Sequence, residues 1–508
     1  MRNVAYTLHR MKDPSLFPND PLADMSEKLA PAGWKALFRF SGVFFDALLF
    51  SKLLSHLLYA LSVWMVFLIG KNIRGLLAGA VSTLLFLHDP FFLNRMSGGL
   101  PRAFYIPLVL FMIYFTVRSW VPGLSLTVLL CGLLYPVSLL FAGAFLAVQI
   151  FIFRMWPRGK AAILIVFFLV SAFLLFNFDE SPGDLVTFKE AERMEEFAEE
   201  GRVPVLPMKN PVKESLGYFF SPFFAASWSR SYEIGYGQEK TDPVGMISAF
   251  LLFFAGIWGL ARQKGSEKAF LFALIVSSLI LYLLARIFFF RLYYPYRYLY
   301  PLSLSSVFIV GAGFAGLAGK MKEKGLLLGT ILLVFFFTFT DVRIVPYNGF
   351  LHFTGQWRSL FMELRNTVSD AVFAGNVYVL DNVPVFSKRS VFISDEMIIP
   401  FFKDSYPERK ERLIENAKIV YSRSREECLE ICQRCGIDYI IIYKPDFTRE
   451  HALQGRFYVS RPLKNSVISI VEDRTDFYLS RVSKDVIFFE TKSFSVIDVA
   501  KLRKIEEK

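Results

Sequence analysis

The stretch "KLLSHLLYALSVWMVFLIG" at residues 52–70 is the first part of the chain that is long and apolar enough to cross a bilayer as a helix. A hydrocarbon core about 30 Å thick needs roughly 20 apolar residues in helical conformation. The basic segment "KNIR" at 71–74 follows, and a second apolar stretch then reaches residue 93. Two apolar stretches joined by a short basic turn predict a membrane protein built of several helices.

The composition of the whole chain agrees with this prediction. Its 508 residues are 54% hydrophobic and 17% aromatic, with a mean hydropathy of +0.41, which excludes a soluble globular protein of ordinary composition. The net charge of +12 is compatible with nucleic-acid binding. In a membrane protein, however, lysine and arginine gather in cytoplasmic loops, so we expect the bilayer as a partner and no nucleic acid.

Further stretches fit the same length, so we expect an α-helical polytopic protein with about ten transmembrane helices. The predicted limits are 52–70, 74–93, 102–118, 121–136, 137–154, 161–177, 246–262, 268–287, 297–316 and 324–341. Pro136 falls between the fourth and fifth spans and is equally compatible with a kink or a re-entrant turn.

Basic residues between the spans predict the orientation. The segments 71–74, 153–160, 261–268 and 319–325 fall on one side of the membrane, which the positive-inside rule makes the cytoplasm. We therefore expect a multi-pass protein of the plasma (inner) membrane, with the loop 178–245 and residues 344–508 outside the cytoplasm. Residues 1–51 also fall outside without a preceding span, which indicates a missing first helix or a translocated tail. Within them, 34–50 suits a helix at the membrane interface.

The division into domains follows from these limits. Residues 1–51 form an extracytoplasmic loop and interfacial helix, 52–343 the transmembrane domain, and 344–508 an extracytoplasmic α/β domain. In the last domain, "NVYVLDN", "RSVFIS", "YIIIY", "VISIVED" and "DVIFFET" are predicted strands, and "SREECLEICQRC" and "YPERKERLIENA" predicted helices. The cysteines of "CLEICQRC" share one helical face, which favours core positions over a disulfide or a metal site.

Charged residues gather at three places that the orientation puts at the outer ends of spans. The residues chosen as candidates are Asp13 and Asp20 in the first loop; His88, Asp89 and Arg102 in "HDPFFLNRMSGGLPR" (88–102); and Arg291, Tyr296 and Arg297 in "ARIFFFRLYYPYRYLYP" (285–301). A carboxylate can act as a general base, arginines can bind a phosphate, and aromatic walls suit an isoprenoid chain. These groups are the ones needed to transfer a sugar from a lipid phosphate.

Each cluster also has a structural interpretation. The Asp-Pro pairs of the first loop can form turns in which the carboxylate bonds to its own backbone. His88 and Asp89 can cap the end of a span, and the Arg-Tyr run can be an interfacial anchor. The residue types alone leave both interpretations open.

The layout of these segments resembles the GT-C superfamily of membrane glycosyltransferases, which take a sugar from a polyprenyl-phosphate carrier. The shared features are acidic residues in a first outward loop ("KDPSLFPNDP"), a second acidic loop ("HDPFF"), an interfacial helix and a C-terminal outward domain. The resemblance implies inverting displacement at the sugar, with Asp20 as base or Asp13 in its place. It implies that Asp89 helps bind an acceptor or a divalent metal ion, Mg²⁺ or Mn²⁺, while the residues themselves establish no cofactor.

The expected partners are therefore a polyprenyl-phosphate-linked sugar and a glycan, lipid or protein acceptor. Glu233, in the Tyr- and Gly-containing stretch 227–243, is a candidate acceptor ligand. Two other functions stay open: a transporter or flippase for a lipid-linked substrate, with arginines lining its path, and a non-catalytic scaffold of the cell envelope.

Overall fold

The structure is a computed structural model that describes most of the chain. The residues outside the description are 1–3, 153–159, 177–183, 199–200, 202, 204, 206–209, 223–242, 262–266, 293, 340–354, 448–460, 473–475 and 506–508. Glu233 lies outside the described residues, as does most of the basic segment 153–160.

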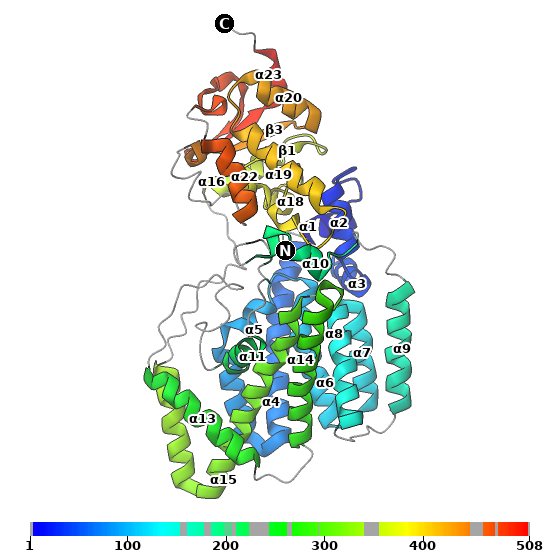
Figure 1. The fold of residues 1–508 in the computed structure, drawn as a ribbon, viewed down its shortest axis with the longest axis vertical. Coiled ribbons are helices and arrows are strands. Elements are labelled where there is room, and N and C mark those ends of the chain that lie inside the picture. Colours follow the sequence, from blue (N-terminus) through cyan, green and yellow to red (C-terminus); the bar gives the residue numbers. More distant parts are fainter. Residues whose placement is uncertain are drawn as a thin grey trace. The chain divides into compact units, whose positions relative to one another are not determined.

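The chain folds into two compact units (Figure 1). The sheet unit comprises Met1–Ala30, Glu180–Pro207 and Leu351–Lys508, and the helical unit comprises Pro31–Asp179 and Met208–Phe350. This division differs from the predicted domains. Residues 1–30 belong with the C-terminal part of the chain, and the predicted outward loop 178–245 is shared between the two units.

The first long helix of the helical unit, α4 (Ala47–His88), is a hairpin. Arg74 and Gly75 have non-helical backbone angles, and Gly75 has a positive φ of 82°. A Cβ atom on Gly70 would lie 2.8 Å from the Cα atom of Gly79, although nine residues span about 13 Å along a continuous helix. The chain therefore reverses at the end of the basic segment 71–74, as the sequence predicts.

The other elements of the helical unit include helices shorter than the predicted spans and helices as long as these spans or longer. They are α3 (Ala32–Ser41), α5 (Pro90–Arg95), η2 (Pro101–Phe104), α6 (Tyr105–Val117), α7 (Val121–Leu134), α8 (Pro136–Ala147), η3 (Val148–Ile152), α9 (Lys160–Phe176), α11 (Pro211–Phe220), α13 (Pro243–Ala261), α14 (Glu267–Phe288), η6 (Phe289–Leu292), η7 (Pro295–Leu299) and α15 (Tyr300–Phe339). The predicted interfacial helix 34–50 is divided between α3 and the start of α4. Tyr135 has extended backbone angles and Pro136 begins α8, so the chain breaks there into two helices.

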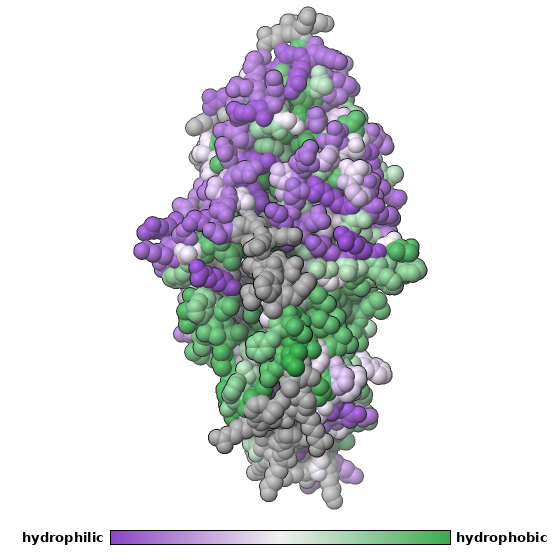
Figure 2. Space-filling view, turned by 90° about the vertical axis from the view of Figure 1, so that its right-hand side faces the viewer, coloured by the Kyte–Doolittle hydropathy of each residue, from purple (hydrophilic) through white to green (hydrophobic). Residues whose placement is uncertain are grey.

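Among the described residues, three segments are long and apolar enough to cross a membrane: Ala47–His88, Ala269–Phe288 and Pro295–Gly319. The prediction of ten spans is therefore not confirmed. Large apolar side chains are nevertheless exposed on these and neighbouring helices, including Leu57, Trp64 and Phe168. Figure 2 shows apolar residues gathered over the helical unit and polar residues over the sheet unit. The chain has the features of a membrane protein.

The sheet unit contains a five-stranded sheet with the order β2-β1-β3-β5-β4. Its strands are β1 (Val372–Gly375), β2 (Ser390–Val391), β3 (Tyr439–Tyr443), β4 (Ile487–Glu490) and β5 (Phe494–Asp498). Strands β1, β2 and β3 are parallel, and β5 is antiparallel to β3 and β4. The helices are α1 (Ala5–Lys12), α2 (Pro21–Leu29), α10 (Phe188–Ala191), η5 (Glu195–Phe197), α16 (Gln356–Leu364), α17 (Val377–Leu380), α18 (Val383–Phe386), η9 (Asp395–Met397), α19 (Tyr406–Val420), α20 (Arg425–Cys435), η10 (Lys444–Phe447), α22 (Arg461–Glu472), η11 (Tyr478–Arg481), η12 (Lys484–Val486) and α23 (Val499–Lys504).

Two of the predicted strands are helices. "NVYVLDN" forms α17 because the Asn376 side chain accepts a hydrogen bond from the Val379 amide and so caps a helix. "VISIVED" lies in α22, where its apolar residues occupy one face of a helix that begins at Arg461. The predicted helix of "CLEICQRC" is present as α20, and Cys428 and Cys432 are buried free thiols in the core.

The first thirty residues are part of the sheet unit's core. Tyr6 and Leu22 pack in the same apolar cluster as Phe373 of β1 and Ile441 of β3. His9 Nε2 lies 3.0 Å from the carbonyl oxygen of Val385 in α18. Burial of these side chains explains why a polar, proline-containing segment has a defined structure at the start of the chain.

Candidate functional site

Asp20 caps a helix in the sheet unit. Its Oδ1 accepts hydrogen bonds from the amides of Leu22 (2.8 Å) and Ala23 (3.2 Å), and the side chain is buried. Burial raises the pKa of Asp20 above its usual range, although the two amide donors and the charge of Arg10 act in the opposite direction. Asp20 therefore has a structural task, and its role as a base is untested by these contacts.

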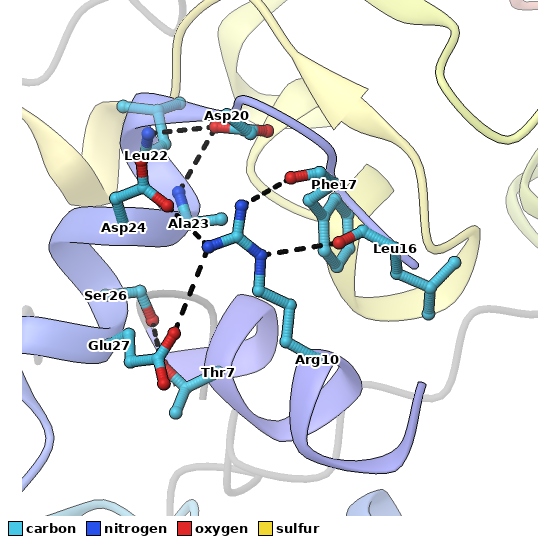
Figure 3. A network of polar contacts seen from close by, with 10 residues as sticks. All are labelled: Thr7, Arg10, Leu16, Phe17, Asp20, Leu22, Ala23, Asp24, Ser26 and Glu27. Atoms are coloured by element: carbon cyan, nitrogen blue, oxygen red, sulfur yellow. Dashed lines mark hydrogen bonds and ion pairs between the residues drawn. The ribbon is translucent and has the colours of Figure 1, made fainter. Parts of the chain in front are cut away.

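Arg10 holds the loop between α1 and α2 in shape (Figure 3). Its guanidinium donates to the carbonyl oxygens of Leu16 (Nε, 3.3 Å) and Phe17, and its Nη1 lies 2.5 Å from Asp24 Oδ1. Phe17 and Asn19 have positive φ angles of 55° and 53°, a strained conformation for residues other than glycine. The arginine thus fixes the backbone just before Asp20.

Asp13 is exposed at the start of the same loop. Its Oδ1 accepts from the Ser15 amide (3.1 Å) and the Ser15 hydroxyl (2.6 Å). These bonds lower the pKa of Asp13. The geometry is that of the self-bonded Asp-Pro turn, and catalysis by Asp13 stays a prediction.

The second predicted cluster lies in the helical unit. Asp89 is buried at the end of α4, where its Oδ1 accepts from the Phe91 amide (3.0 Å) and begins α5. His88 before it and Arg102 in η2 are both half-buried. Arg95, in the last turn of α5, is buried with its guanidinium over the rings of Phe91 and Tyr300.

The third predicted cluster lies in the same unit and adjoins the second. Arg297 of η7 donates from Nη1 to the hydroxyl of Tyr135 (2.9 Å), and Arg291 is exposed in η6. The Tyr300 ring centroid lies 5.9 Å from that of Tyr105, which in turn lies 5.8 Å from that of Tyr135.

These contacts bring cations and phenol rings together from several helices. We call the group the arginine–tyrosine cluster: Arg95, Tyr105, Tyr135, Arg297 and Tyr300. Tyr105 is 1% exposed, and its hydroxyl bonds to none of the described residues. Arg95 is buried and Arg297 half-buried among aromatic rings. Both offer strong hydrogen-bond donors in a largely apolar setting, which suits an anionic group attached to a lipid.

Several residues of the site were not predicted from the sequence, among them Glu214. Glu214, on α11, is buried and accepts hydrogen bonds from the hydroxyls of Tyr282 and Tyr296 and from Arg286. We call these four residues the glutamate quartet. The signal was present in "NPVKESLGYFFS", where Asn210 and Pro211 begin a helix and Glu214 falls on the same face as Tyr218.

The described residues contain no cluster of the side chains that usually bind metals. No three His, Cys, Asp or Glu side chains within the described ranges are grouped so that they could hold an ion. Asp89 already uses Oδ1 to cap α5. Binding of Mg²⁺ or Mn²⁺, which the family resemblance implies, stays a prediction.

Comparisons with known proteins find a likeness of fold and no related sequence. No family profile and no curated protein sequence matches the chain. Crystal structures of the oligosaccharyltransferase of Archaeoglobus fulgidus do match: one in complex with Zn and sulfate (TM-score 0.50, 12% identity) and one tethered to an acceptor peptide (TM-score 0.52, 12% identity). The fold of this chain is therefore similar to that of the archaeal oligosaccharyltransferase.

A third structure of that archaeal protein, AglB, contains an inhibitory peptide and a dolichol-phosphate (TM-score 0.50, 11% identity). Each match covers 91% of this chain and 66–67% of the archaeal protein. The chain therefore spans about two thirds of its structural neighbour, and at this level of identity the likeness shows the fold alone.

Proposed function

We propose that this protein is a membrane glycosyltransferase that moves a sugar from a polyprenyl-phosphate carrier to an acceptor. The observation that carries the proposal is the arginine–tyrosine cluster, with Arg297 bonded to Tyr135, inside a fold similar to that of the archaeal oligosaccharyltransferase. A structural neighbour was solved with a dolichol-phosphate and another with an acceptor peptide. The acceptor can be a glycan, a lipid or a protein. The proposal also includes a location in the plasma membrane, with residues 344–508 outside the cytoplasm.

The proposed reaction is an inverting displacement. The acceptor's nucleophilic atom attacks the anomeric carbon, the bond from that carbon to the phosphate oxygen breaks, and the lipid phosphate leaves with the additional negative charge. Arg297, with Arg291 and Tyr296 beside it in the chain, would bind that phosphate. Charge-assisted hydrogen bonds to a departing phosphate lower the barrier because its negative charge increases as the bond breaks.

The base that takes the acceptor's proton is proposed to be Asp20, with Asp13 in its place. Asp89, with His88 and Arg102 near it in the sequence, would contact the acceptor or the sugar, as would Glu233. Because asparagine caps a helix as well as aspartate does, an Asp20→Asn variant keeps the structural role of residue 20 and removes its basicity.

The test uses the purified full-length protein in lipid nanodiscs with polyprenyl-phosphate sugars carrying a radioactive sugar. We expect label to enter an acceptor fraction with the wild-type protein and Arg297→Ala to bind the donor roughly tenfold less tightly or worse. Tyr135→Phe removes the hydroxyl that accepts a hydrogen bond from Arg297. This variant should lose part of the affinity for the donor. In sealed proteoliposomes, movement of intact donor across the membrane without release of lipid phosphate would refute transfer and favour a flippase.

A further inference from the structure

The buried face of α11 contains a single charged side chain. Glu214, Gly217, Tyr218 and Ser221 recur at the spacing of one helical face, and all four are buried. Ser303 Oγ donates to the Tyr218 carbonyl oxygen (2.7 Å) and lies 2.9 Å from Ser221 Oγ, which fixes this face against α15. Burying a carboxylate on such a face costs free energy unless the carboxylate is paired. The partners of Glu214 therefore indicate its role.

Glu214 is bonded through both oxygens. Oε1 accepts from the Tyr296 hydroxyl (2.8 Å), while Oε2 accepts from the Tyr282 hydroxyl and from Arg286 Nη1 (3.2 Å). The side chains of Glu214 and Arg286 are only 6% and 14% exposed. Both oxygens of this carboxylate are therefore occupied by three donors, one of which is a cation. Its task is therefore positional.

The group that Glu214 positions is the Arg286 guanidinium. Nη1 of Arg286 lies 2.6 Å from the Tyr282 hydroxyl as well as 3.2 Å from Glu214, and the guanidinium carbon lies 5.4 Å from the centre of the Tyr282 ring. Nε and Nη2 make no hydrogen bond to any described residue. One end of the guanidinium is thus anchored, and its other edge keeps the pair of parallel N–H donors that matches a phosphate.

Glu214 also connects this arginine with the arginine–tyrosine cluster. Arg286 lies near the end of α14 and Tyr296 lies in η7, directly before Arg297. By bonding to both, Glu214 holds the two ends of the 287–295 connection, in which Arg291 is exposed.

We propose that Glu214 positions Arg286 so that its Nε and Nη2 donors bind the phosphate of the lipid-linked donor. This inference rests on the proposed function, because it assigns a second arginine to the same ligand. Glu214 is a positioning residue, since it acts through Arg286 and does not touch the phosphate itself.

The experiment measures binding by the purified full-length protein in nanodiscs, with farnesyl phosphate as the probe, farnesol as the probe without phosphate, and inorganic phosphate as the probe without lipid. Glu214→Gln keeps the shape of the side chain and removes its charge. We expect this variant to bind farnesyl phosphate roughly tenfold less tightly than the wild type, with farnesol binding unchanged. Lys213→Gln, an exposed change on the same helix, should leave all three affinities unchanged.

A double-mutant cycle tests whether Glu214 acts through the arginine. In an Arg286→Lys background, the guanidinium edge is already lost, so adding Glu214→Gln should cause little further loss of affinity. Equal losses in both backgrounds would overturn the inference. If Glu214→Gln fails to fold, Tyr282→Phe, which removes the hydroxyl bonded to both Glu214 and Arg286, takes its place with the same expectation.

The outcomes separate the two proposals. Wild-type protein that binds farnesyl phosphate no better than farnesol would overturn the proposed function. If the wild-type protein prefers farnesyl phosphate to farnesol and Glu214→Gln binds farnesyl phosphate with the same affinity, only the positioning role is overturned. Binding of inorganic phosphate as tight as that of farnesyl phosphate would show a site for free phosphate and would also count against a lipid ligand.

Discussion

Asp446 gives the sheet unit a dependence on pH that can be measured. It lies in η10, directly after β3, and is 2% exposed. The Asn376 side chain, which follows β1, donates from Nδ2 to Asp446 Oδ2 (2.6 Å). Burial raises the pKa of Asp446 to about 7, although the bond from Asn376 acts in the opposite direction. We predict that Asp446→Asn stabilises the sheet unit above neutral pH.

The sign and size follow from the two pKa values. In the unfolded chain Asp446 loses its proton near pH 3.8, and in the folded unit near pH 7. Between these values the folded state binds more protons, so the free energy of unfolding falls as pH rises from about 4 to about 7. The difference of about 3 pKa units corresponds to roughly 4 kcal/mol at pH 8, which we take as an upper limit. The amide of the Asp446→Asn variant cannot ionise, and its oxygen can still accept from Asn376, so the variant escapes this loss.

The assay uses the buried thiols of the same unit. Cys428 and Cys432 are fully buried in the sheet unit, so they react with a thiol reagent only when that unit opens. Labelling is measured by peptide mass spectrometry in increasing urea, comparing variant with wild type at each pH because thiol reactivity itself depends on pH. We expect a higher urea midpoint for Asp446→Asn at pH 8 and equal midpoints near pH 4. Asp485→Asn, at an exposed position of the same unit, is the control; equal midpoints for Asp446→Asn and wild type at pH 8 would refute the reasoning.

Three further predictions concern single contacts of the sheet unit. Asp20→Ala should lower the free energy of unfolding by about 0.5–2 kcal/mol through loss of the helix cap, whereas Asp20→Asn should not; equal losses in urea titrations would show that the cap contributes nothing. Gly375→Ala should lower the free energy of unfolding of the sheet unit by roughly 1–3 kcal/mol. The reason is that Gly375 has a φ of 131° and a Cβ atom there would lie 2.0 Å from the Ile441 carbonyl oxygen. Unchanged hydrogen exchange in β1 and β3 would contradict this prediction. Arg10→Met should lower the free energy of unfolding by about 2 kcal/mol and make the loop before Asp20 sensitive to protease. If the variant resists cleavage as well as the wild type does, Arg10 does not restrain this loop.

The boundaries between elements were predictable wherever a local signal decides them. The basic turn 71–74 and the break at Pro136 each interrupt a helix through the backbone itself, as Gly75 and the extended Tyr135 show. The strand "YIIIY" was predictable because β-branched residues buried on both faces fit a central strand. "NVYVLDN" misled because its apolar residues favour a strand, whereas the cap by Asn376 favours a helix and prevails in the fold.

Contacts between distant segments were not predictable from pattern alone. The N-terminal loop is polar, and nothing in its spacing indicates that Tyr6 packs in one cluster with Phe373, from the far end of the chain. Glu214 was missed for a related reason. The helix start at Asn210 and Pro211 was readable in the sequence, but the three donors of Glu214, namely Tyr282, Tyr296 and Arg286, come from distant segments and identify it as a buried acceptor.

The proposed base and the proposed phosphate-binding groups lie in different units, so sugar transfer and phosphate binding can be tested separately. The arginines and the glutamate quartet belong to the helical unit, whereas Asp13 and Asp20 belong to the sheet unit. If a base comes from the first loop, sugar transfer depends on both units, while binding of the lipid phosphate depends on the helical unit alone. Gly375→Ala, which weakens the sheet unit, should then reduce transfer and leave the affinity for farnesyl phosphate unchanged. Full transfer by a variant whose sheet unit is open, judged by labelling of Cys428, would place the base among the carboxylates of the helical unit, with Asp89 the first to examine.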